Sequence, residues 1–187
     1  IGVHGIIPLN HFDKNLTNNH IFIALWRIID GKGIGIGLRM YKKILKKYKP
    51  DFIGGLPIAP HVLAFYKWQG FKCDMMDHHV ALSPYIKEYK VAKVPDGLKV
   101  KYQKKKLLGS FRQLTINDLL NLKTKTLYSH QLPLKSDQYI INRYMNHPVY
   151  KYEVYAIIKD TLVQALCVIR PIFKEDSMVI NLVDFIG

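Results

Sequence analysis

Hydrophobic residues in the first half of the chain form segments separated by polar turns. Residues 1–9 and 20–29 are rich in isoleucine, with valine, phenylalanine and tryptophan added, and a polar stretch lies between them. These residue types favour extended backbone. We therefore expect two consecutive strands, paired antiparallel.

After the second strand the hydrophobic period changes from two to nearly four. Apolar side chains recur at Ile36, Met40, Ile44 and Tyr48, with lysines on the opposite side. This spacing predicts a helix that Pro50 ends. A short strand is expected at residues 51–56, a helix at 59–69 with Gly70 as its C-terminal cap, and a strand at 71–82. Helices that alternate with strands indicate an α/β arrangement with parallel pairing.

The second half has another order of elements. Residues 83–106 show little periodicity, and 111–115 predict a strand. Thr115 is a good N-cap with Asp118 three residues later, and residues 137–146 predict a second helix. Three strand-like segments follow, joined by short polar turns: 150–159, 162–173 and 177–186. A strand, two helices and an antiparallel meander are therefore expected.

The strands of the second half are apolar on both faces. Alternation predicts Val163, Ala165, Cys167 and Ile169 on one face, against Leu162, Leu166 and Val168 on the other. A sheet of this kind needs a partner surface. The first half of the chain or another chain could supply it, for instance a second copy in a homodimer.

The segment with the clearest chemistry is the glycine cluster between the second strand and the first helix. Gly31, Gly33, Gly35 and Gly37 let backbone amides approach a ligand closely, and the helix start adds free N–H donors. This combination predicts a phosphate or pyrophosphate site. The cluster lacks the Gly-Lys-Ser/Thr end of a Walker A loop and the glycine spacing of a Rossmann fingerprint. A flexible glycine turn is the alternative.

Two motifs resemble the GNAT superfamily of N-acetyltransferases. Residues 30–35 resemble its cofactor loop, Q/R-x-x-G-x-G/A, and residues 66–71 (YKWQGF) resemble its Tyr-x-x-x-Gly-Phe helix end. The resemblance implies that the loop binds the pyrophosphate of acetyl-coenzyme A through Gly31, Lys32, Gly33, Ile34, Gly35, Ile36 and Gly37. It also implies that Tyr66 donates a proton to the departing thiolate. A core tyrosine is the alternative. Asp30 and Ala59 depart from the family pattern.

The same resemblance divides the chain. Residues 1–93 resemble the cofactor-binding half of a GNAT domain, 94–106 form a connector, and 107–187 resemble the opening half of a second, incomplete module. Tandem GNAT-like proteins linked to surface-polysaccharide synthesis look similar. The implied fold is α/β (α+β), a GNAT-like mixed sheet flanked by helices with a second partial module.

The implied activity is acyl-CoA-dependent N-acyl transfer to a small-molecule amine, with acetyl-CoA favoured. An amino sugar or nucleotide-linked amino sugar is the favoured acceptor. No carboxylate suggests itself as base. His4, His20, His78 and His79 lie on expected strands, and a structural role is the alternative for each. Six tyrosines in the second half could line a sugar-binding wall or fill a sheet: Tyr128, Tyr139, Tyr144, Tyr150, Tyr152 and Tyr155.

The net charge of +14 indicates an anionic partner or surface. Its lysines gather in residues 42–49 and 99–106, on a helix and a connector, and solvated surfaces explain them equally. A nucleic-acid binder interleaves basic and aromatic residues on a strand surface, so the enzyme is favoured. The alternative is a non-catalytic GNAT-fold module that binds nucleic acid. No apolar run approaches the roughly 20 residues of a membrane span. The distant pair Cys73 and Cys167 gives no metal spacing, and we expect a cytoplasmic protein.

Overall fold

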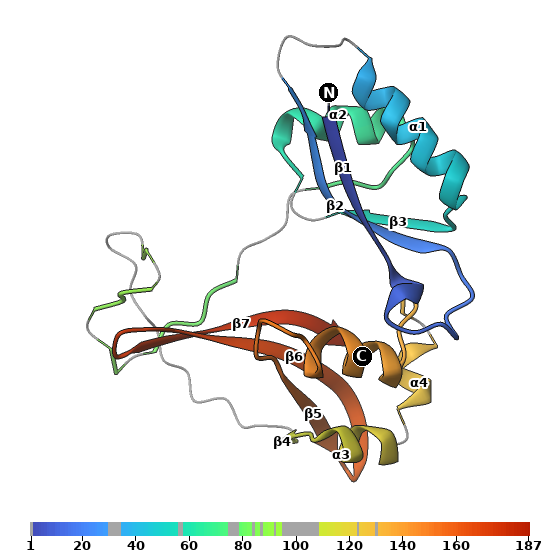
Figure 1. Cartoon of the computed structure of the whole chain (residues 1–187). Helices are drawn as coiled ribbons and strands as arrows, with labels where there is room; N and C mark the ends of the chain where they lie inside the picture. The colour runs from blue at the N-terminus through green and yellow to red at the C-terminus, as the bar shows by residue number, and fades with distance from the viewer. Residues whose placement is uncertain are drawn as a thin grey trace. The chain divides into compact units, whose positions relative to one another are not determined.

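The computed structural model describes residues 2–29, 35–55, 58–74, 79–83, 85–86, 88–91, 93–94, 109–122, 124–129 and 131–187 (Figure 1). Over these residues the fold is mixed α+β, with two separate sheets and several helices. The chain divides into two compact units, Ile1–Val80 and Ala81–Gly187, and each is described by itself. None of the helices in the described ranges is both long and apolar enough to span a bilayer.

The first unit contains a three-stranded sheet in the order β1-β2-β3. Strand β1 (Gly2–Pro8) pairs antiparallel with β2 (His20–Ile28), which confirms the predicted pair. Strand β3 (Phe52–Gly55) pairs parallel with β2, also as predicted. A short 3-10 turn, η1 (Leu9–His11), follows β1.

Two helices pack on the same face of this sheet. Helix α1 (Ile36–Tyr48) has the predicted bounds, and α2 (Pro60–Trp68) lies within the predicted helix at 59–69. Gly70, expected to cap α2, is left-handed with φ +86°. Tyr41 of α1 and Phe65 of α2 both contact Trp26 of β2, with ring centroids 6.1 Å and 5.4 Å away. The helices therefore share one aromatic core with the sheet.

The predicted strand at residues 71–82 is wrong for the part of it that the structure describes. Residues 71–74 and 79–82 form no strand. Residue preference alone does not make a strand, because its backbone must pair with a neighbour. In the described residues the sheet of the first unit ends at β3.

The second unit contains a four-stranded antiparallel sheet in the order β4-β5-β6-β7. Its strands are β4 (Ser110–Gln113), β5 (Glu153–Lys159), β6 (Leu162–Lys174) and β7 (Ser177–Ile186). The predicted meander is confirmed, and the turns Asp160-Thr161 and Glu175-Asp176 join its strands.

Four helical segments accompany this sheet: α3 (Ile116–Asn121), α4 (Lys125–Tyr128), α5 (Asp137–Ile140) and the π-helix η2 (Ile141–Met145). The predicted cap of α3 is confirmed. Thr115 Oγ1 accepts from the Asp118 N–H at 3.1 Å, and Asp118 Oδ2 accepts from the Thr115 N–H at 2.8 Å. The helix predicted at 137–146 changes from α to π geometry after Ile140, and α4 was not predicted.

One face of the second sheet is buried, and the other, called the open face below, buries Ala165 and Cys167 but leaves larger side chains exposed. Val154, Ala156, Leu166, Val168 and Ile186 are buried on the first face. The open face exposes large apolar side chains, namely Phe111, Met178, Ile180, Leu182 and Phe185. Both faces are thus apolar, as predicted.

Two residues lie on the faces opposite to those predicted. Ile157 pairs with Ala165 and Ile158 with Val163, so Gln164 is an extra residue in β6. This bulge reverses the alternation of side chains. Val163 therefore shares the buried face with Leu166, and Leu162 belongs to the open face.

Candidate functional site

The predicted cofactor residues lie where β2 leads to α1. Gly31, Lys32, Gly33 and Ile34 are outside the described residues. Gly35 is the N-cap of α1 in the left-handed conformation (φ 82°), which glycine adopts without strain. Among the described residues no side chain caps this end, and the first turn holds no acidic residue. The first N–H groups of α1 are thus uncapped donors, suited to an anion.

Gly37 has a packing role of its own. A Cβ at this position would lie 2.7 Å from Ile28 Cδ1 and 3.1 Å from Trp26 Cζ2. Side chains do not approach so closely, so a larger residue would push α1 away from β2. The glycine lets the start of the helix touch the strand, and its predicted role toward a ligand stays a prediction.

Tyr66, the predicted catalytic residue, lies in the aromatic core of the first unit. It is 6% exposed, and its ring meets Trp26, Tyr41 and Phe71 edge-on at 6.1, 6.3 and 5.8 Å between centroids. Burial, followed by Tyr41 and Cys73, raises its pKa to about 12. Complete transfer of its proton to a thiolate of pKa about 8.5 would therefore cost roughly 5 kcal/mol. Donation of a hydrogen bond carries no such cost.

Four buried polar atoms in this core have no hydrogen-bond partner among the described residues: His4 Nδ1 and Nε2, Trp26 Nε1 and Tyr41 Oη. The rings touch, because His4 stacks on Trp26 at 4.8 Å and Trp26 on Tyr41 at 6.1 Å. Burial lowers the pKa of His4, which keeps the imidazole neutral. An unpaired buried polar group costs about 1–3 kcal/mol. These residues are called the unpaired cluster below. Their unpaired buried atoms lower the free energy of unfolding.

The other candidate bases lie elsewhere or are not described. His20 is buried at the opposite end of β2 from Gly35, against Phe52. Burial lowers its pKa, and Asp51 opposes that shift. His79 is exposed, and His78 lies outside the described residues. His4, by contrast, packs in the aromatic core that contains Tyr66, because its ring stacks on Trp26.

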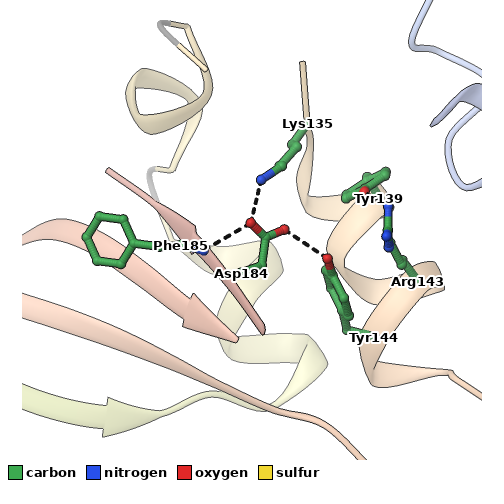
Figure 2. Close-up of polar contacts among 6 residues, drawn as sticks. All are labelled: Lys135, Tyr139, Arg143, Tyr144, Asp184 and Phe185. Carbon is green, nitrogen blue, oxygen red and sulfur yellow. Dashed lines mark hydrogen bonds and ion pairs between the residues drawn. The ribbon is translucent and has the colours of Figure 1, made fainter. Parts of the chain in front are cut away.

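The second unit holds a buried polar network that the sequence did not predict (Figure 2). Asp184 of β7 accepts from Lys135 Nζ at 2.5 Å, from the Tyr144 hydroxyl at 2.9 Å and from the Phe185 N–H at 2.9 Å. The Lys135 and Asp184 side chains are 9% and 14% exposed. Burial and the Asp184 charge raise the pKa of Tyr144. Arg143 donates to the Tyr139 hydroxyl.

A bulge in β7 explains why this network was missed. Leu182 pairs with Ile169 and Asp184 pairs with Val168, so Val183 is an extra residue. Without it, Asp184 would share the open face with Leu182. The bulge turns the carboxylate to the buried face, toward Tyr144. The partners of Asp184 are all fixed by the fold, which indicates a structural role.

The six tyrosines of the second half do not form one wall. Tyr128, Tyr139 and Tyr144 are buried in the core. Tyr150 is half exposed, and the Arg170 guanidinium lies over its ring, 4.6 Å from the centroid. The three buried tyrosines lie on α4, α5 and η2, so they fill the core from helical segments and not from the sheet as the alternative expected. In the described part of the chain no group of three metal-ligating side chains gathers, and Cys73 and Cys167 are free thiols.

Comparisons of the chain with protein-family models, curated proteins and solved structures gave no match. The GNAT resemblance therefore rests on the two sequence motifs alone.

Proposed function

We propose that the chain is a GNAT-type N-acyltransferase that uses an acyl-CoA, with acetyl-CoA favoured, to acylate a small amine such as an amino sugar or nucleotide-linked amino sugar. The observation that carries this proposal is the junction of β2 and α1. There Gly35 adopts a left-handed turn directly before an uncapped helix, next to a parallel strand pair. Such a turn suits a pyrophosphate.

The edge of β2 supports the same proposal. Its described pairing with β3 ends at Ile23↔Gly55, whereas β2 continues to Ile28 in pairing with β1. Over that last part the described residues give β2 no partner on the β3 side. An extended chain with amide groups, such as the pantetheine arm of coenzyme A, can hydrogen-bond to a strand edge of this kind.

The residues of the first unit suit the chemistry of the transfer. The amine nitrogen forms a bond to the acyl carbon as the carbon–sulfur bond breaks, and the sulfur leaves with the electron pair. Tyr66 donates a hydrogen bond to that sulfur, since its raised pKa disfavours complete transfer. The proton of the amine passes to water or to neutral His4.

Calorimetric titration with acetyl-CoA and with free coenzyme A tests the cofactor site. Gly33→Val and Gly35→Glu are expected to abolish binding, because a side chain would occupy the place of the pyrophosphate. Gly5→Ala is the matched control, since its added Cβ would lie 3.4 Å from Leu25 Cβ, an ordinary contact. Unchanged affinity in both loop variants would remove the basis of the proposal.

Tyr66→Phe tests the role of the tyrosine. We expect kcat to fall by roughly 10²-fold, the low end of the range for acid catalysis, with little change in cofactor affinity. The burial of Tyr66 in the aromatic core favours one alternative, a GNAT-fold module that binds coenzyme A without catalysis. Binding without turnover in the wild-type protein, over a panel of amines, would support that alternative.

A further inference from the structure

The outer face of α1 carries a row of cations, called the lysine stripe below. It consists of Arg39, Lys42, Lys43, Lys46, Lys47 and Lys49, all exposed. The opposite side of the helix is fixed, because Tyr41 is 1% exposed and packs on Trp26. At 1.5 Å of rise per residue the stripe extends over about 15 Å. The fold thus presents a rigid row of positive charge.

Among the described residues, no acidic side chain forms an ion pair with this row. Helix α1 contains no aspartate or glutamate. The ion pairs seen among the described residues involve Lys90 and Lys135, both in the second unit. Like charges four residues apart, such as Lys42 and Lys46, destabilise a helix by about 0.2–0.5 kcal/mol a pair. The helix dipole favours the cations of its last turn but opposes Arg39 near its start.

Lys49 supplies a second, independent sign that charge is retained at the expense of stability. It ends α1 in the left-handed conformation, with φ 42° and ψ 56°. Glycine or asparagine occupies such a position at lower energy, since the side chain of an L-residue costs roughly 1–2 kcal/mol there. A lysine at this position extends the stripe by one more cation.

The composition of the exposed face decides which anion fits it. The exposed residues of α1 are all cations, and its apolar side is used in the core. A helix that lies on a membrane presents aromatic or aliphatic side chains to the lipid, which this face lacks. Lysines act as hydrated point charges, which suit phosphates spaced along a strand and read no base.

We infer that the lysine stripe binds the phosphate backbone of a nucleic acid, weakly and without regard to sequence. This surface is separate from the glycine turn and does not depend on the proposed acyltransferase activity. The expectation from the sequence favoured the enzyme over a nucleic-acid binder, and the two properties can coexist because they use different surfaces.

Fluorescence anisotropy over a salt series tests the inference, with labelled 20-base-pair DNA duplexes of unrelated sequence. We expect micromolar binding that is equal for all duplexes, with a slope of log K against log salt near about −4, as for four or five phosphates. The triple variant Lys42→Gln/Lys43→Gln/Lys46→Gln should reduce the magnitude of this slope by about 3. The control variant Lys151→Gln/Lys159→Gln/Lys174→Gln removes three exposed lysines from the second unit and should leave it unchanged.

Four results would overturn the inference. The first is no binding of the duplexes by the wild type at low salt. The second is the same slope and affinity in the stripe variant as in the wild type. The third is tighter binding to phosphatidylserine vesicles than to the duplexes at equal salt, which would assign the stripe to a membrane surface. The fourth is strong preference for one duplex, which would require contacts to bases.

Discussion

The two units bury polar groups in opposite ways. In the second unit, the carboxylate of Asp184 accepts from Lys135, Tyr144 and the Phe185 amide. In the first unit, the unpaired cluster buries four polar atoms of His4, Trp26 and Tyr41 that have no partner in the part of the chain that the structure describes. Folding alone explains the first arrangement, because each group satisfies another. It does not explain the second, because a phenylalanine at position 41 would fill the space without an unpaired hydroxyl.

This difference leaves the unpaired groups of the first unit without an explanation in their own packing. Unpaired buried polar groups are rare in folded proteins, and each one lowers stability. The unpaired cluster touches Tyr66 and adjoins the start of α1 through Trp26 and Gly37. The stability of single variants can test the contrast directly.

The largest expected effect is in the second unit. Lys135→Met leaves the buried charge of Asp184 without its cation, which should lower the free energy of unfolding by about 3 kcal/mol. Denaturant unfolding of the whole chain measures it. The double variant Lys135→Met/Asp184→Leu removes both charges and should recover part of the loss. A loss below about 1 kcal/mol for Lys135→Met would mean that water already solvates the pair.

A smaller effect compares two buried tyrosines by the same substitution. Tyr144→Phe removes a hydrogen bond to a charged group and should cost about 2 kcal/mol. Tyr41→Phe removes a hydroxyl that has no partner, so stability should stay equal or rise slightly. Tyr48→Phe, on the same helix as Tyr41, is the control for the loss of a hydroxyl from α1. Equal losses at positions 144 and 41 would contradict the contrast between the units.

The smallest effect is a pH dependence in the first unit. Burial lowers the pKa of folded His4 below its usual 6.5, so the unfolded chain takes up the proton first as the pH falls. The contribution of neutral His4 is complete above pH 6.5 and is lost as the pH falls from 6.5 toward the folded pKa. His4→Phe should make the free energy of unfolding less dependent on pH in this range. The pH dependence that remains in this variant should come from His20, whose pKa is also lowered by burial. A slope equal to that of the wild type would exclude His4 as its source.

Helices were predictable where local signals agree with one another. In α1 the four-residue apolar spacing, the glycine before it and Pro50 after it all indicate the observed bounds. The cap of α3 is equally local, since Thr115 and Asp118 bond to each other. The unpaired cluster was not predictable, because it depends on which rings meet across β1, β2 and α1.

The second unit shows where periodicity fails. A strand pattern predicts faces only while the alternation is unbroken, and the extra residues Gln164 and Val183 break it. The π geometry after Ile140 likewise follows from no residue preference, although it carries Arg143 and Tyr144 into the network. The buried ion pair of Lys135 and Asp184, 49 positions apart, left no signal that a single sequence reveals.

The bulge at Val183 also determines which mutations β7 can tolerate. Replacing Val183 changes one exposed side chain, and the strand should accept many residues there. Deleting it would rotate Asp184 onto the open apolar face, away from Lys135, and turn every later side chain with it. For this strand, length is under stronger constraint than composition. A library of single-residue deletions through residues 177–186 should therefore lose folded protein at positions where a library of substitutions does not.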